Sequence, residues 1–117
     1  MTLAPSLAAT ATSHLLVRAG DVLCALPLAS VRRVVRELST FPLPGAGARL
    51  RGLAEFAGEP LAVLDLARLV EAPAGATPPY PVTIVVWVGP AAARELVGLA
   101  VDEACAVVEI PGERVAK

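Results

Sequence analysis

Aromatic side chains are scarce in this chain of 117 residues, where Phe, Trp and Tyr together make up only 3%. The core must therefore be built from valine, leucine and alanine. Hydrophobic residues nevertheless reach 56%, which excludes disorder for most of the chain. The length suits one compact domain and is too short for two ordinary ones. Eleven prolines and nine glycines interrupt the chain often, and this favours short strands over long helices.

An excess of positive charge is also missing, since the net charge is −1 and the pI about 5.8. A nucleic-acid-binding protein needs a basic stripe to displace phosphate counterions, and an anionic membrane surface attracts a polybasic patch. Arg32, Arg33 and Arg36 form the one basic cluster, which we interpret as a solvated face or, alternatively, a docking site for a partner. A small β-barrel that binds nucleic acid is thus the disfavoured alternative of another class.

Residues that carry chemistry are few: the chain has one histidine, His14, and two cysteines, Cys24 and Cys105. A metal site needs more ligands, and no triad or Gly-rich phosphate loop accompanies these residues. Both cysteines lie in apolar runs and are interpreted as buried free thiols in a reducing compartment. Asp102 and Glu103 are interpreted as turn residues. The sequence therefore predicts neither an enzyme, nor a cofactor, nor a metal.

Targeting signals are absent from the sequence pattern. The start of the chain lacks a basic region followed by a continuous apolar core, as a secretory signal would have. The strongest apolar run, residues 82–88, is far too short to span a bilayer. We therefore expect a soluble, cytoplasmic protein with no direct membrane insertion.

Turn residues divide the chain into short predicted strands. Residues 1–13 are rich in Ala, Thr and Ser and are expected to form a disordered arm, whereas residues 71–81, with four prolines, are expected to form a linker. Ala57-Gly58-Glu59 is a hairpin signal, and Asp65 is expected to cap a short helix over 66–70. Residues 82–88 are expected to be a strand buried on both faces. Further strands are predicted at 14–18, 22–26, 52–56, 61–64, 95–101 and 106–110.

The stretch after Pro27 is ambiguous. Apolar residues at 28, 31, 34, 35 and 38 have helical spacing and place the arginines opposite, which favours a helix. Its valines are β-branched and favour a strand. Periodicity alone favours the helix.

A repeated segment indicates internal symmetry. The first copy spans residues 25–66, and a second begins at Gly98 and ends near Pro111. In this alignment Cys105 falls on Val31 and Val108 on Val34, while nothing follows to match residues 52–66. Because every apolar face needs a partner, we expect an incomplete second unit with an open strand edge or an exposed apolar patch.

An ordered set of motifs resembles the CheW-like domain family over about residues 14–111. Each motif is weak alone, but their order is specific. The motifs are Leu15-Leu16-Val17, Gly20, Ala25-Leu26-Pro27-Leu28, Val31, Val34-Val35, Pro42-Leu43-Pro44-Gly45, Gly52-Leu53, Gly58, Val63-Leu64-Asp65-Leu66, Thr83-Ile84-Val85-Val86, Val97-Gly98-Leu99-Ala100-Val101-Asp102-Glu103 and Val107-Val108.

The resemblance implies a mostly β fold with two small SH3-like barrels side by side. We expect one domain over 14–117, with a first barrel at 14–70 and an incomplete second barrel at 82–117. After Leu28 it implies one short helical turn and then a strand, which we adopt from about Arg33 onward. It also implies a non-enzymatic coupling protein that bridges the cytoplasmic tips of methyl-accepting receptors to a CheA-type histidine kinase.

Two departures from the family pattern stand out. The family's Asn-x-Arg-Gly hairpin reads Glu55-Phe56-Ala57-Gly58 here, so the arginine position is Ala57, and Ala62 replaces an expected proline. Array contacts made by that arginine are lost or replaced. The family also continues beyond the 107–111 strand with further strands and a helix, so we expect a C-terminally shortened member, as in a Frz-type system.

The resulting hypothesis is an adaptor that binds the receptor tip but docks the kinase weakly or not at all. The receptor would lie in an apolar groove between the barrels. Its predicted lining is Val31, Arg33, Val34, Ile84, Val86 and Leu99, with Arg33 at the rim and ordinary barrel core as the alternative role for the apolar members. A complete coupling protein is the alternative within the family. Another CheW-like protein, or a second copy paired through the open edge, is a further expected partner.

Overall fold

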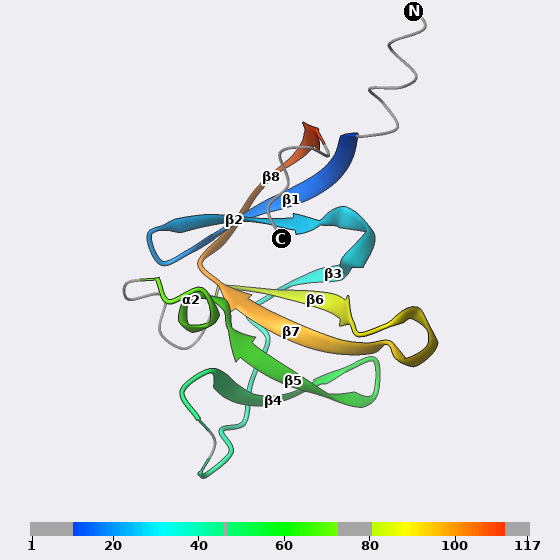
Figure 1. The fold of residues 1–117 in the computed structure, drawn as a ribbon. Coiled ribbons are helices and arrows are strands. Elements are labelled where there is room, and N and C mark those ends of the chain that lie inside the picture. Colours follow the sequence, from blue (N-terminus) through cyan, green and yellow to red (C-terminus); the bar gives the residue numbers. More distant parts are fainter. Residues whose placement is uncertain (1–10, 46, 73–80, 112–117) are drawn as a thin grey trace, which may run out of the picture.

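The computed structural model describes residues 11–45, 47–72 and 81–111, which form two β-sheets. A three-stranded antiparallel sheet has the order β2-β1-β8, with β1 at Ala11–Ala19, β2 at Val22–Pro27 and β8 at Glu103–Pro111. A five-stranded sheet has the order β3-β6-β7-β5-β4 (Figure 1). Its strands are β3 (Val31–Arg36), β4 (Leu50–Phe56), β5 (Glu59–Asp65), β6 (Val82–Val88) and β7 (Glu95–Val101). The predicted mostly β class is confirmed.

The strand pairing crosses the expected division of the chain. β8 pairs with β1, so the ends of the described chain lie side by side, and β5 pairs in parallel with β7. The two sheets therefore do not follow the expected division into residues 14–70 and 82–117. The structure also differs from the expected arm at residues 11–13, because these pair with residues 109–111 of β8. Residues 1–10 of the arm and 73–80 of the linker lie outside the described residues.

Two apolar cores explain why the five-stranded sheet is buried so deeply. The shared core lies between the two sheets; its buried members are Leu15, Val17, Ala19, Leu66, Ala67, Val82, Ile84, Val86, Leu99 and Val101. The second core lies on the other face of the five-stranded sheet and contains Ala54, Leu61, Val63, Val85 and Ala100. β6 contributes alternate residues to both cores, so residues 82–86 are all buried. The strand predicted to be buried on both faces is confirmed.

The ambiguous stretch after Pro27 is a single 3-10 turn, η1 (Leu28–Ser30), followed at once by β3. The periodicity-based expectation of a helix is wrong, and the turn and strand implied by the resemblance are found, with the strand already starting at Val31. β3 pairs with β6 from Val31 to Arg36. These backbone hydrogen bonds and the β-branched valines outweigh a spacing that only resembles a helix.

Local signals around β4 and β5 predicted their turns well. The hairpin turns at Ala57 and Gly58, whose φ angles of 53° and 81° suit a two-residue type I′ turn. Asp65 caps the short helix α2 (Leu66–Leu69), since its Oδ1 accepts from the Arg68 N–H at 3.4 Å. Its Oδ2 lies 3.3 Å from Nε of Arg51. Asp65 is therefore a structural residue, as expected.

Gly52 lets the chain fold back against β4. Its φ is 149°, and a Cβ there would lie 2.4 Å from the Phe41 carbonyl oxygen. Next to it, the Phe41 N–H donates to the Leu53 carbonyl at 2.7 Å, and the Leu53 N–H donates to the Phe41 carbonyl at 2.9 Å. The close approach requires glycine and fixes Phe41 beside β4.

The parts of the two copies that match each other are both strand–turn–strand units that cross between the sheets. The first leaves the three-stranded sheet at β2 and enters the other at β3; the second leaves at β7 and returns at β8. Asp102 stabilises the connection between β7 and β8. Its N–H donates to the Arg18 carbonyl at 2.9 Å, its Oδ1 accepts from the Gly20 N–H at 3.2 Å, and its Oδ2 lies 3.4 Å from the Arg18 guanidinium. The expected turn role of Asp102 thus extends to joining both sheets.

Candidate functional site

The predicted groove residues come from three neighbouring strands of the five-stranded sheet. Val31 lies opposite Val86 and Val34 opposite Ile84, and Ile84 lies in turn opposite Leu99 on β7. Directly opposite residues of an antiparallel pair share a face of the sheet. The apolar members of the set therefore share the face that looks toward the three-stranded sheet.

Burial divides this set in two. Ile84, Val86 and Leu99 are buried members of the shared core, because β6 and β7 are central strands covered by the other sheet. They present no surface to a partner in this structure. Val34 lies on the edge strand β3 and keeps 43% of its surface exposed, and Val31 is half-buried. Together with Leu28 of η1, which is 38% exposed, these residues form what we call the β3 margin.

Arg33 occupies the other face of β3. A register shift between Val31 and Arg33 lets Arg32 and Arg33 both lie over the Phe56 ring, at 5.8 and 5.9 Å from its centroid. Such contacts at exposed sites contribute about 0.5–1 kcal/mol each. Arg33 is exposed and lies opposite Val85, whereas Val34 lies opposite Ile84. Arg33 is therefore next to the β3 margin in the chain but on the other face of the sheet.

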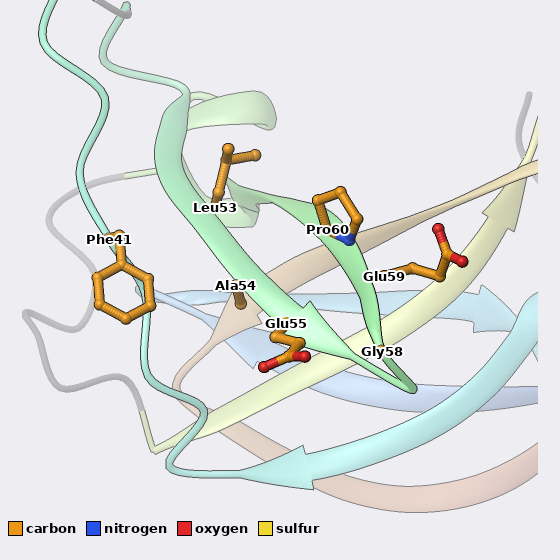
Figure 2. A pocket seen from close by; sticks show the side chains of 7 residues that line it. All are labelled: Phe41, Leu53, Ala54, Glu55, Gly58, Glu59 and Pro60. Carbon is orange, nitrogen blue, oxygen red and sulfur yellow. The ribbon is translucent and has the colours of Figure 1, made fainter.

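A shallow hollow of about 270 Å³ on the β4–β5 hairpin was not predicted from the sequence (Figure 2). Its lining is Phe41, Leu53, Ala54, Glu55, Gly58, Glu59 and Pro60. Phe41 is 69% exposed, more than any other large hydrophobic residue that the structure describes. The one signal in the sequence is the proline-containing stretch from Phe41 to Pro44, which cannot continue a helix or strand. The bridge that brings Phe41 to Leu53 is not local, so the hollow could not be anticipated.

The residues set aside as non-catalytic have varied surroundings. Cys24 is half-buried against the shared core, and this burial raises the pKa of its thiol. Cys105 is exposed, which corrects the expectation of two buried thiols: the strand β8 turns every second residue away from the core. His14 is buried, with Nδ1 3.2 Å from the Thr12 carbonyl oxygen.

Neither a metal centre nor a membrane span is found in the part of the chain that the structure describes. No group of three or more His, Cys, Asp or Glu side chains is gathered there as a metal site would require. No helix among the same residues has the length and apolar character needed to cross a bilayer.

Comparison with known proteins agrees with the fold. The scaffolding protein TtCheW from Thermoanaerobacter tengcongensis has a similar structure, with a TM-score of 0.76 and 20% sequence identity over 87% of this chain and 67% of that one. At that identity the likeness concerns the fold alone. No curated protein shows significant sequence similarity to the chain. The sequence model of the CheW-like domain matches residues 13–117, and the chain therefore belongs to the CheW-like domain family.

Proposed function

We propose that this chain is a chemosensory adaptor whose β3 margin binds the cytoplasmic tip of methyl-accepting receptors. Membership of the CheW-like family supports a chemotaxis adaptor role that works through protein–protein contacts rather than catalysis. The finer assignment depends on one observation: Val34 is 43% exposed although it shares a face with buried Ile84. An exposed valine beside the core, on a strand edge, suits an apolar helical partner.

Receptor binding can be tested with one matched pair of variants. Val34→Asp places a charge at the β3 margin and should weaken binding to a receptor cytoplasmic fragment about tenfold or more, because the carboxylate would have to be buried. Val70→Asp is the control: Val70 is 42% exposed at the end of α2, which packs on β5 and β7, so the same change there should leave binding intact. Isothermal titration calorimetry measures both. Equal weakening by the two variants, or no receptor binding by the unaltered chain, would refute the proposal.

Kinase docking separates this proposal from its closest alternative, a complete coupling protein that bridges receptors to a CheA-type kinase. That the neighbour TtCheW is a scaffolding protein favours the alternative. We propose weak or absent docking, and co-purification with receptor fragments and with the kinase, in separate experiments, tests it. Robust kinase binding without receptor binding would contradict the proposal, and strong binding to both would establish the alternative. Membership of a Frz-type system stays a prediction.

Pairing of two copies through an open strand edge also stays a prediction. Among the described residues, β8 has β1 as its one strand neighbour, and an unpaired edge offers hydrogen-bonding groups to another chain. Size-exclusion chromatography with light scattering decides between monomer and dimer, and a strict monomer would contradict the pairing. Because the receptor tips are cytoplasmic, a cytoplasmic location is part of the same proposal.

A further inference from the structure

The β4–β5 hairpin carries apolar surface that the receptor proposal does not use. Phe41, Leu53 and Pro60 line the hollow there, and Phe41 is 69% exposed (Figure 2). Protein interfaces are enriched in aromatic residues relative to the rest of the surface. In a chain with only 3% aromatic residues, an exposed phenylalanine held in place by two backbone hydrogen bonds is unusual. The hollow is wide and smaller than the roughly 300–1,000 Å³ typical of small-molecule sites, so it suits the side chain of a protein partner.

Two carboxylates give this surface its charge. Glu55 and Glu59 line the hollow, both are exposed, and neither forms an ion pair within the described residues. Glu59 lies opposite Phe56 in the β4–β5 pairing and so shares its face, whereas Glu55 lies opposite Pro60 on the other face. Arg32 and Arg33 lie over Phe56, whose ring packs toward the second core, and adjacent residues of a strand point to opposite faces. Glu55 therefore points away from the face on which those arginines lie.

We propose that this surface, formed by Phe41, Leu53, Glu55, Glu59 and Pro60, docks a protein segment that presents a lysine or arginine beside an apolar side chain. The apolar side chain fills the hollow against Phe41, Leu53 and Pro60. The cation meets Glu55, which shares their face, and Glu59 adds negative charge beside the turn. Charge complementarity selects the partner, and burial of apolar area supplies the affinity. The surface is separate from the β3 margin, so it does not depend on receptor binding there.

The test uses the full chain labelled with ¹⁵N and two synthetic peptides of seven residues. One peptide has a central lysine between two leucines, with glycine and serine at its ends; the other has glutamate in place of the lysine. Titration at low salt is followed by NMR. The lysine peptide should shift the amide signals of Phe41, Leu53, Glu55, Gly58 and Glu59. The glutamate peptide should bind at least fivefold more weakly. Absence of binding at millimolar lysine peptide, shifts that map elsewhere, or equal binding of both peptides would overturn the proposal.

A matched pair of double variants assigns the effect to these carboxylates. E55Q combined with E59Q should raise the Kd for the lysine peptide about fivefold, in line with the loss of one exposed ion pair and of the neighbouring negative charge. D21N combined with E109Q changes the net charge equally at exposed positions outside the hollow and should leave the Kd unchanged. All four positions are exposed, so both proteins should fold. Equal effects of the two double variants would mean that overall charge, and not this surface, attracts the peptide.

Discussion

The five-stranded sheet is packed on both of its faces, whereas the three-stranded sheet is packed on one. The first has the shared core on one side and the second core on the other. The three-stranded sheet contributes Leu15, Val17 and Ala19 to the shared core. Its other face, where Arg18 and Leu23 are exposed, is not covered by any core cluster of the described residues. The difference teaches that the three-stranded sheet depends on its neighbour for stability, while the five-stranded sheet has a core of its own.

Ile84→Ala tests the dependence of the three-stranded sheet on the shared core and should cause the largest loss of unfolding free energy. Ile84 is fully buried in the shared core, and truncation of a buried isoleucine costs about 2–5 kcal/mol of unfolding free energy. Urea denaturation measures the total loss. Hydrogen exchange should show that β1, β2 and β8 lose more protection than β4 and β5, because the latter keep the second core. Uniform loss across both sheets would contradict the comparison.

Gly52→Ala tests the five-stranded sheet at its edge, with an intermediate effect. The new Cβ would meet the Phe41 carbonyl oxygen, and alanine would need a φ of 149°. We expect a loss of about 1–3 kcal/mol, the usual cost of a residue in a strained backbone region. Gly47→Ala is the control, since a Cβ there meets nothing within 4 Å. If thermal denaturation gives the two variants the same stability, the approach of Phe41 to β4 is not fixed as described.

Asp102→Asn tests the junction between the two sheets and should cost less unfolding free energy than the two substitutions above. The ion pair with Arg18 would be lost, and the bond from the Gly20 N–H weakened, at a side chain that is 17% exposed. We expect about 1 kcal/mol, discounted for the 45% exposure of Arg18. Faster hydrogen exchange confined to the β1–β2 turn and the start of β8 would locate the effect. Glu103→Gln, at a side chain that is 59% exposed, should change stability by less than about 0.5 kcal/mol. A larger effect would mean that Glu103, and not Asp102, stabilises the connection between β7 and β8.

Local chemistry decided which features could be predicted from the sequence. The turn at Ala57 and Gly58, the cap at Asp65 and the strand at 82–88 each depend on residues close together in the chain, and the structure contains all three. The helical spacing after Leu28 misled because pairing with β6, some fifty residues away, decides the conformation there.

The candidate site was predictable only in part, for the same reason. The residues that the resemblance implied for the groove lie on neighbouring strands, but their burial differs: Ile84 is covered by the three-stranded sheet, while Val34, directly opposite, lies on an edge strand. That difference depends on which strand ends the sheet, and strand order is a property of the whole fold. The hollow beside Phe41 depends likewise on the distant Gly52–Leu53 segment.

The pairing of β1 with β8 sets the order of events during synthesis. Ala11 lies opposite Pro111, so β1 has to wait for β8, at the other end of the described residues, before its ladder is complete. Until then, β2 is the one strand of this sheet with which β1 can pair. Long-range pairing of this kind slows folding and leaves sheet edges exposed to other chains. We therefore expect β1 of a nascent molecule to keep an edge open to other chains until β8 has been synthesised.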